Sequence, residues 1–281
     1  MNRIFHSLSI PVLLVLVMGV VGCSVLRGAG KKEEKLKDAD QRLATGPNRE
    51  YRSPSYANPA KRNPNVNLPA NFSGGLAVSH SRGLSTHPYV AITFDDGPHP
   101  RNTPRLLDML RRRNIKATFY VIGELVQRYP GITRRIVAEG HEIGNHTWTH
   151  ANLTKLGDGA VRSEMNRTRD IIVSTTGVKP RTMRPPYGAL LGRQREMIFR
   201  EYGYPTILWS VDPKDWQRPG ANVVADRIVS GANNGAIILA HDLHASTVDA
   251  MPQTLDRLLD RGFQFITVSQ MLTQKGAASV R

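Results

Sequence analysis

Short apolar runs alternate with amphipathic stretches along the chain from Pro88 onward. The run at 89–94 is apolar at nearly every position, which predicts a buried strand. Thr103 followed by Pro104 predicts an N-cap with proline at the first helical position. The same pattern predicts further strands at 116–122, 142–145, 181–184, 206–209, 236–240 and 263–268. It predicts helices at 105–113, 132–138, 159–175, 194–201, 223–229 and 247–260.

Strands that alternate with helices predict an α/β fold, in which a parallel sheet is joined by right-handed crossovers. About seven such units fit a small or incomplete β/α barrel better than the full barrel of about eight. An open doubly wound sheet is the competing architecture. The chain contains neither the Gly-x-Gly-x-x-Gly fingerprint nor a Walker-type loop, so nucleotide-binding motifs are missing from this framework.

The first segment, residues 1–22, has the pattern of a signal peptide. Arg3 precedes an apolar stretch at 10–21, which is shorter than the about 20 residues that a transmembrane helix needs. A buried or anchoring helix is the alternative. Cys23 follows Val20-Val21-Gly22, which resembles a bacterial lipobox whose cysteine is lipidated and becomes the mature N-terminus. We therefore expect an exported protein with a lipid anchor in a membrane; the alternative is a secreted protein with a free thiol.

Residues 23–86 are poor in large apolar side chains and rich in proline. Such a composition predicts a flexible basic tether, with a basic arm that grips an anionic polymer as the alternative. It leaves 87–275 as the folded domain and 276–281 as a short tail. Ser24, the residue after Cys23, is not aspartate, which resembles an outer-membrane sorting signal of Gram-negative bacteria.

Composition narrows the choice of partner only slightly. The 281 residues include 38 Lys+Arg and 23 Asp+Glu, a formal charge of +15, so we expect an anionic partner such as nucleic acid, a membrane surface or an acidic polymer. A single cysteine excludes a disulfide framework and a cysteine-rich metal site. Roughly half of the positive excess lies outside 87–275, and no nucleic-acid motif is recognised, so we expect no nucleic-acid partner.

Polar residues gather at the predicted carboxyl ends of five strands, where parallel α/β folds place their function. Each motif alone has a structural reading, such as a rigid turn or a core histidine, but five at successive strand ends favour an active site. His146 and His150 are four residues apart and would lie on one face of a helical turn. The five motifs are Asp95-Asp96-Gly97-Pro98, His146-Thr147-Trp148-Thr149-His150, Arg184-Pro185-Pro186-Tyr187-Gly188, Asp212-Pro213-Lys214-Asp215-Trp216 and Leu239-Ala240-His241-Asp242.

These residue types complete one chemistry. Two histidines and a carboxylate form a three-ligand metal site with an open position for water. Of two adjacent aspartates that point in different directions, one can bind the metal while the other acts as a base. A separate histidine can protonate a leaving group. The set predicts metal-assisted hydrolysis of an acyl bond.

The same motifs resemble the five ordered motifs of the polysaccharide deacetylase family, the NodB-homology domain of carbohydrate esterase family 4. The likeness covers about 88–272. It implies a distorted, incomplete β/α barrel, in agreement with the strand count. The matching motifs are Thr93-Phe94-Asp95-Asp96-Gly97-Pro98, His146-x-x-x-His150, Arg184-Pro185-Pro186-Tyr187, Asp215-Trp216 and Leu239-x-His241.

The resemblance implies that Asp96, His146 and His150 bind a divalent metal, usually zinc, although some members prefer cobalt or nickel. It implies that Asp95 is the general base and that Arg184 orients it. No motif residue is missing, which argues against an inactive member of the family.

The resemblance also implies that His241 is the general acid, held and kept protonated by Asp215. The backbone N–H of Tyr187 would stabilise the tetrahedral oxyanion together with the metal. Trp216 and Leu239 would line the acetyl pocket.

We therefore expect a monomeric, lipid-anchored de-N-acetylase that acts on N-acetylglucosamine units of a cell-envelope polysaccharide, with peptidoglycan as the leading substrate. Chitin oligomers, poly-N-acetylglucosamine and acetylated xylan remain alternatives, because the five motifs do not separate them. A wall-binding protein without turnover is the alternative from another class.

Overall fold

Strand β2 (Tyr89–Gly97) lies at the centre of a parallel sheet. The structure is a computed structural model, and it describes residues 61–68 and 78–274. Strand β2 pairs with β3 (Thr118–Val121) on one side and β6 (Ala236–His241) on the other. Strand β4 (Glu142–Asn145) lies beyond β3, and β7 (Gln264–Phe265) pairs with the beginning of β2. All these pairings are parallel, as the alternation of strands and helices predicts.

Short strand pairings and single-residue bridges connect the remaining segments between β4 and β6. Strand β1 (Ser79–His80) pairs with β5 (Thr206–Ile207). Single-residue bridges join Met183 to both Asn145 and Thr206, and another joins Val211 to Ile238 of β6. The order β2, β3, β4, Met183, β5, Val211, β6 therefore returns to its starting strand through isolated bridges. This is the distorted, incomplete barrel that the sequence predicts.

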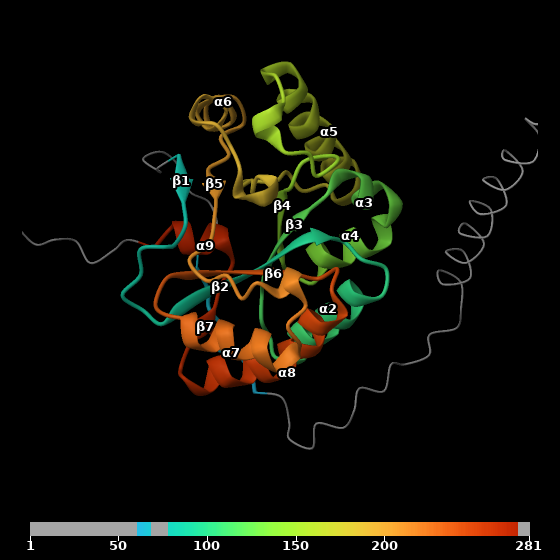
Figure 1. Cartoon of the computed structure of the whole chain (residues 1–281). Helices are drawn as coiled ribbons and strands as arrows, with labels where there is room; N and C mark the ends of the chain where they lie inside the picture. Colours follow the sequence, from blue (N-terminus) through green and yellow to red (C-terminus); the bar gives the residue numbers. More distant parts are fainter. Residues whose placement is uncertain (1–60, 69–77, 275–281) are drawn as a thin grey trace, which may run out of the picture. The chain divides into compact units, whose positions relative to one another are not determined.

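Helices cover the outside of this sheet (Figure 1). Helices α2, α7 and α8 pack together along one side, and α3, α4 and α5 along another. Helix α8 illustrates why they form: Val248, Met251, Leu255 and Leu258 recur every three or four residues and are all buried. The helices are α2 (Asn102–Arg112), α3 (Gly123–Arg128), α4 (Pro130–Ala138), α5 (Asp158–Thr176), α6 (Gly192–Tyr202), α7 (Ala221–Gly231), α8 (Ala245–Asp260) and α9 (Val268–Leu272).

Side chains alternate between the two faces of β2, so the apolar core lies on one face and polar residues lie on the other. Val90, Ile92 and Phe94 belong to the apolar cluster that also contains the buried faces of α2, α7 and α8. Ala91 belongs to a second cluster, on the other face of the strand. Because side chains on one face recur every two residues, Thr93 and Asp95 share the face of Ala91. The interior of the barrel is thus apolar at its base and polar at its carboxyl end.

Several predicted elements differ from the observed ones. The predicted strand at 181–184 is reduced to the bridge at Met183, and the predicted strand at 263–268 to β7, because Val268 begins α9. Helix α3 and strand β1 were not predicted. Thr103 is not an N-cap, because α2 begins at Asn102. Its hydroxyl instead accepts from the His99 N–H at 2.7 Å and donates to Asp242.

Part of the predicted tether at 23–86 packs on the domain. The Asn63 side chain accepts from the Phe265 N–H at 2.8 Å and donates to the Phe265 carbonyl at 3.1 Å. Val66 and Leu68 pack against the inner apolar cluster, and β1 extends the sheet. The predicted boundary at residue 87 is therefore too late. Composition misses these contacts because they depend on backbone hydrogen bonds to distant strands rather than on local apolar content.

The predicted signal peptide at 1–22 and the lipidated Cys23 lie outside the described residues. Within 61–68 and 78–274, no helix combines the length and hydropathy that a membrane span requires.

Candidate active site

A bulge at the end of β2 brings two consecutive aspartates to the same pocket. Consecutive residues of a regular strand point to opposite faces. The pairing of β2 with β3 shifts register between Asp95 and Gly97, and Asp96 has a φ of 68°. This local kink re-aims the Asp96 side chain. As a result Asp95 Oδ2 lies 3.9 Å and Asp96 Oδ1 lies 3.2 Å from the same atom, His146 Nε2. Both carboxylates therefore face one site, with Asp96 closer to the imidazole and Asp95 farther from it.

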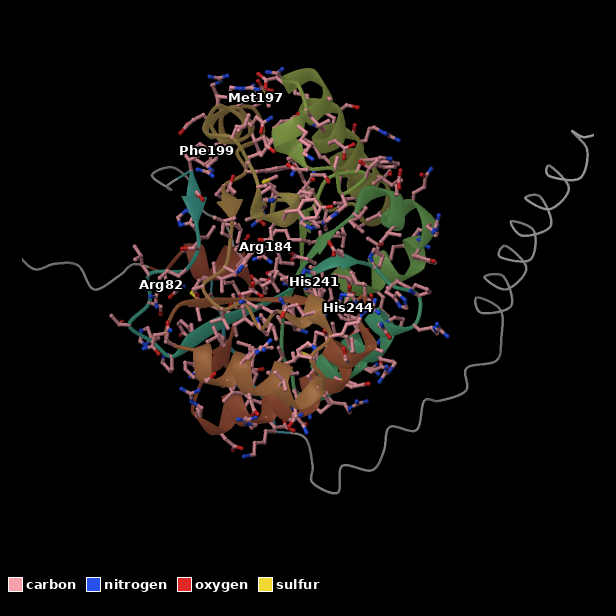
Figure 2. All side chains as sticks on the ribbon, viewed as in Figure 1. Arg82, Arg184, Met197, Phe199, His241 and His244 are labelled. Atoms are coloured by element: carbon pink, nitrogen blue, oxygen red, sulfur yellow. The ribbon has the colours of Figure 1, made fainter. Side chains whose placement is uncertain are left out.

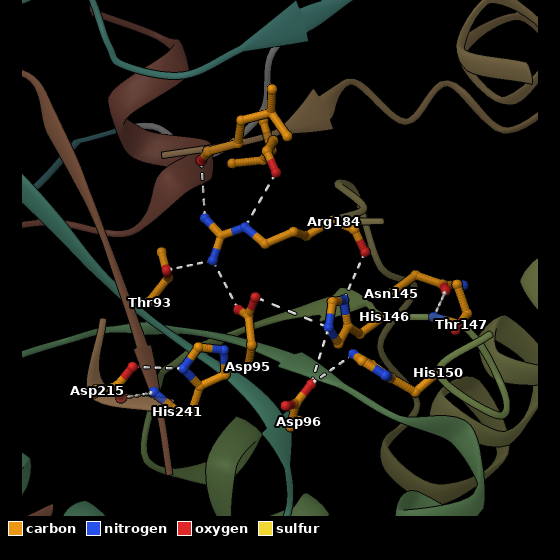
Figure 3. A network of polar contacts seen from close by, with 12 residues as sticks. Thr93, Asp95, Asp96, Asn145, His146, Thr147, His150, Arg184, Asp215 and His241 are labelled. Atoms are coloured by element: carbon orange, nitrogen blue, oxygen red, sulfur yellow. Dashed lines mark hydrogen bonds and ion pairs between the residues drawn. The ribbon is translucent and has the colours of Figure 1, made fainter. Parts of the chain in front are cut away.

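His146 and His150 meet across a loop, and the helical turn expected from their spacing is absent. The segment after β4 is irregular, with a φ of 67° at Thr147 and 60° at His150. Both Nε2 atoms face Asp96 Oδ1, at 3.2 Å from His146 and 3.1 Å from His150 (Figure 3). The prediction that these three residues meet is confirmed, but the backbone that brings them together is different from the predicted one.

The three side chains fit a divalent metal. One ligand atom from each of Asp96, His146 and His150 lies within 4.8 Å of the others. Asp96 Oδ1 is buried and accepts no well-formed hydrogen bond in the described part of the chain. His146 Nδ1 lies 2.7 Å from the Arg184 carbonyl oxygen, so it is this nitrogen that carries the hydrogen and the Nε2 lone pair is free to bind a cation. Two imidazoles and one carboxylate are a common zinc ligand set.

Electrostatics at this site favour a bound cation. Burial raises the pKa of Asp96, but the two imidazoles that face its carboxylate, His146 and His150, outweigh this effect and hold that pKa well below its usual range. Burial lowers the pKa of His146, and Asp96 and Asp95 together outweigh it and raise that pKa. Two carboxylates therefore hold positive charge at this position, either as protons on imidazole or as a metal ion.

Arg184 fixes Asp95 from behind. The guanidinium is fully buried and donates from Nη1 to Asp95 Oδ1 at 2.7 Å and to Thr93 Oγ1 at 2.6 Å. Its other nitrogens donate to the carbonyl oxygens of Ile207 at 3.1 Å and Leu208 at 3.0 Å. The group also lies over the ring of Tyr120, 4.4 Å from its centroid. A buried arginine with this many partners has one orientation, so Asp95 is held rigidly.

His241 and Asp215 form a second pair on the opposite side of the pocket (Figure 3). Asp215 is fully buried; its Oδ1 lies 2.8 Å from His241 Nδ1 and its Oδ2 accepts from the His241 backbone N–H at 2.8 Å. The Thr247 hydroxyl donates to the same Oδ2 at 2.8 Å. Burial lowers the pKa of His241, but the hydrogen bond and charge of Asp215, with Asp95 and Asp96, outweigh it and raise that pKa to about 9. Figure 2 shows Arg184, His241 and His244 near the middle of the domain as viewed, and the ring centroids of His241 and His244 are 6.2 Å apart.

Both aspartates and the histidines His146, His150 and His241 line one cavity of about 500 Å³, while Arg184 and Asp215 support them from behind. Leu239 forms part of its floor, and the Tyr187 ring packs edge-on against His150 with centroids 4.8 Å apart. Tyr187 and Trp216 remain 68% and 53% exposed, so both stand at the rim. The cavity is lined by Asp95, Asp96, His146, His150, Pro185, Tyr187, Gly188, Trp209, Asp212, Trp216, Leu239 and His241.

The backbone at Tyr187 is also unusual. Its φ of 61° places it in the left-handed region inside the short 3₁₀ turn Pro186–Gly188. The hydrogen bonds of this turn run from the N–H groups of Gly188 and Ala189, so the Tyr187 N–H takes no part in them. A backbone N–H at the rim of the cavity is a suitable donor to a developing oxyanion.

Ten predicted site residues thus meet at one place, and Cys23 lies outside the described residues. Three features of the site were not predicted: Trp209 as a cavity wall, Thr247 as a partner of Asp215, and the hydrogen bond that Asp242 accepts from the Thr103 hydroxyl. Burial raises the pKa of Asp242 to about 7, against the hydrogen bond from Thr103. The position of Trp209 at the end of a predicted strand was a usable signal. Thr247 gave none, because its contact depends on how α8 docks.

Comparisons with known proteins agree with this geometry. The sequence profile of the polysaccharide deacetylase family matches residues 83–207. The peptidoglycan-N-acetylglucosamine deacetylase of Listeria monocytogenes is 40% identical over 190 residues, 68% of this chain and 40% of that protein. The peptidoglycan-N-acetylmuramic acid deacetylase of Bacillus subtilis is 39% identical over 182 residues, 65% of this chain and 38% of that protein. The chain therefore spans about two fifths of the length of these two relatives.

A solved structure covers the domain more completely. The Bc1960 peptidoglycan N-acetylglucosamine deacetylase, in complex with 4-naphthalen-1-yl-N-oxidanyl-benzamide, superposes with a TM-score of 0.68 at 33% identity. The match covers 70% of this chain and 94% of that one. With the fold, the five motifs and the convergence of their side chains in one cavity, these likenesses establish that the chain belongs to the polysaccharide deacetylase family.

Proposed function

We propose that this protein is a metal-dependent hydrolase that removes N-acetyl groups from N-acetylglucosamine residues of peptidoglycan. The observation that carries the proposal is the arrangement around one cavity of a two-histidine, one-carboxylate trio, a fixed carboxylate at Asp95 and the His241 imidazole paired with Asp215. This is the set of groups that hydrolysis of an unactivated amide needs.

The contacts around the cavity support the roles that the family resemblance implies. A divalent metal held by Asp96, His146 and His150 would supply Lewis-acid polarisation of the acetyl carbonyl and a lowered pKa for water. Asp95, held by Arg184, accepts the proton of the attacking water. The Tyr187 N–H donates to the oxyanion as the oxygen–carbon bond forms.

His241 completes the reaction. Its raised pKa, about 9, keeps the imidazole protonated at neutral pH. It donates a proton to the sugar nitrogen as the carbon–nitrogen bond breaks, so the products are acetate and a free amine. Leu239 and Trp216 border the space that the acetyl methyl group would occupy.

The substrate is inferred from chemistry and from likeness. The two relatives described above are named for N-acetylglucosamine and N-acetylmuramic acid of peptidoglycan. A basic chain suits a polymer that carries carboxylates. The lipobox-like Val20-Val21-Gly22-Cys23 supports export and a lipid anchor on the envelope side of a membrane. Zinc is the metal we propose, with cobalt and nickel as alternatives.

The proposal is tested by incubating the purified protein with peptidoglycan, chitin oligomers, poly-N-acetylglucosamine and acetylated xylan while acetate is measured. We expect acetate from peptidoglycan, loss of activity with a chelator, and recovery when zinc is restored. His150→Ala removes one ligand and should abolish release, whereas Asp170→Asn, a change at an exposed residue away from the cavity, should not. Failure to release acetate from any of these polymers with metal present would refute the proposal.

Mass spectrometry of wall digests from cells with and without the gene would identify the modified sugar. We expect unacetylated glucosamine only where the protein is present. Unacetylated muramic acid in its place would move the assignment to the other sugar of the same polymer.

A further inference from the structure

We propose that Glu164 is a positioning residue that holds the loop between the two metal-binding histidines, and that it thereby sets the affinity of the site for metal. Glu164 lies on α5, outside the five family motifs, and does not line the cavity. The inference rests on the metal centre of the proposed function and concerns how this chain prepares it.

The Glu164 carboxylate binds two consecutive residues of that loop. Oε2 accepts from the backbone N–H of Trp148 at 2.7 Å and from that of Thr149 at 2.8 Å. Oε1 accepts from the Thr149 hydroxyl at 3.0 Å. His146 lies two positions before Trp148, and His150 directly follows Thr149. A single carboxylate therefore fixes the middle of the connection between the two ligands.

The loop needs such a partner because its backbone follows no regular pattern. Thr147 and His150, on either side of the two bound N–H groups, are both in the left-handed region. This conformation is unfavourable for threonine and histidine and persists only where the surroundings enforce it. The N–H groups of Trp148 and Thr149 have no other partner in the described part of the chain.

Other contacts hold the remaining polar groups of the loop. The Thr147 N–H donates to Asn145 Oδ1 at 2.9 Å. The carbonyl oxygens of Thr147 and Trp148 accept from Gly123 and Glu124 at the start of α3, at 3.0 and 3.2 Å. Helix α3 thus anchors the carbonyls, and Glu164 on α5 anchors the N–H groups that follow. Removing Glu164 leaves one side of the loop without support.

Among the described residues, the polar contacts of the Glu164 carboxylate are all with this loop. Within the described residues it makes no ion pair, although Arg167, one turn away on α5, lies 4.1 Å from the centroid of the Trp148 ring. The carboxylate is half-buried, and hydrogen bonds from backbone N–H groups to an ionised acceptor are about twice as strong as neutral ones. Removing the carboxylate therefore affects the loop more than it affects the helix surface.

Groups that orient metal ligands typically contribute about 10–100-fold to metal affinity. We expect Glu164→Ala to weaken zinc binding by this factor. Glu164→Gln keeps the length and an oxygen for both backbone N–H groups but loses the charge, so it should weaken zinc binding by less than Glu164→Ala. Glu164→Asp keeps the charge but is one methylene shorter, so it should bind zinc more weakly than Glu164→Gln.

The measurement is zinc affinity, by competition with a chromophoric chelator in the absence of substrate, on the whole protein. Thermal unfolding with and without zinc accompanies it, because a ligand that binds the native state raises the midpoint by an amount set by its affinity. A positioning role shrinks the rise caused by zinc, whereas a merely structural role lowers both midpoints equally. Asp170→Ala, at an exposed carboxylate on the same helix, is the matched control and should leave zinc affinity unchanged.

Zinc affinity in Glu164→Ala within twofold of the wild type would overturn the inference. If that variant does not fold, the order of the other two decides: Glu164→Asp binding zinc more tightly than Glu164→Gln overturns it. A wild-type protein that binds zinc but releases no acetate would refute the proposed function and leave this inference standing. A wild-type protein that binds no zinc would overturn both.

Discussion

Each end of the sheet carries a buried or half-buried polar cluster. The two clusters differ in whether their carboxylate oxygens have hydrogen-bond donors. At the amino end, Glu142 of β4 accepts from Ser269 through its N–H at 2.7 Å and its hydroxyl at 2.8 Å. It also accepts from the hydroxyls of Thr118 at 3.1 Å and Thr182 at 3.2 Å. Both carboxylate oxygens are therefore satisfied. At the carboxyl end, Asp96 Oδ1 has no well-formed hydrogen bond. The first cluster stabilises the fold, and the second is arranged for a ligand.

The backbone differs between the two ends in the same way. Left-handed residues in the helix-to-strand loops, at the amino end, are glycines together with Asn114, a residue type that tolerates this conformation. The strand-to-helix segments hold two such glycines, Gly188 and Gly220, but most of their left-handed residues carry side chains. The glycines of the amino end are Gly140, Gly177, Gly203, Gly235 and Gly262, and the residues with side chains at the carboxyl end are Asp96, Thr147, His150, Tyr187, Lys214 and Arg218.

The comparison shows where strain is tolerated. Where only a turn is needed, glycine supplies it without steric cost. At Asp96, His150 and Tyr187, which line the cavity, the chain keeps a larger residue in a conformation that the surrounding contacts hold. The following predictions test this contrast, from the largest expected effect to the smallest.

At the carboxyl end of the sheet, Asp96→Asn should greatly reduce activity while it leaves the stability of the fold nearly unchanged. Asparagine tolerates the φ of 68° and keeps the side-chain shape, but it is a poor metal ligand. We expect acetate release to fall by about 10³-fold, because the metal contributes several kcal/mol to the barrier. The unfolding free energy of the metal-free protein, measured in urea, should change by less than about 1 kcal/mol. A large loss of stability with metal absent would contradict the contrast.

The pH dependence of the reaction should report the Asp215–His241 pair. His241 donates only when protonated, and its pKa is about 9, so kcat/KM should fall as pH rises through about 9. Asp215→Asn removes the negative charge that raises this pKa while burial still lowers it. The alkaline limb should then move down toward the ordinary histidine range, with activity at pH 8 reduced by about tenfold or more. If the alkaline limb of the pH profile does not move in Asp215→Asn, that limb reports a group other than His241.

Glu142→Ala should have the opposite effect to Asp96→Asn. Removing the carboxylate leaves the Ser269 N–H and several hydroxyls without their partner, which costs about 2–3 kcal/mol of unfolding free energy. We expect kcat per folded molecule to stay within twofold, because Glu142 lies at the other end of the strands from the cavity. Ser269→Ala removes one of the hydrogen bonds and should cost about 1 kcal/mol. A variant of Glu142 that is as stable as the wild type would mean that this cluster does not stabilise the fold.

The smallest effects concern backbone conformation alone. Gly177 has a φ of 73° and open space around it, so Gly177→Ala should cost about 1–2 kcal/mol from strain without a clash. Lys214 has a φ of 53° and is exposed. In Lys214→Gly the relief of strain offsets the greater freedom of the unfolded chain, so the change should stay within about 0.5 kcal/mol. Equal losses in the two variants, measured by urea unfolding, would remove the distinction between the two ends.

Much of the fold and of the site was predictable from local patterns. The alternation of apolar runs and helical stretches predicted the parallel sheet, and the five motifs predicted which side chains meet. Both signals are local, because strand period, helix period and side-chain chemistry are properties of short segments. The family likeness added the roles, and the comparisons confirm the family and the fold.

Tertiary structure decided what these short segments cannot encode. The bulge at Asp96 turns both aspartates to one cavity, and the loop held by α3 and Glu164 brings His146 to His150 without a helix. Asn63, from the predicted tether, satisfies the backbone of Phe265 in β7. Each depends on hydrogen bonds between segments far apart in the chain, whose geometry exists only once the strands and helices have packed together. Local patterns alone predict the order of the elements and the side chains that meet at the cavity. Their directions come from the packed domain, because contacts between distant segments hold the loop that contains Thr147 and His150 in left-handed conformations.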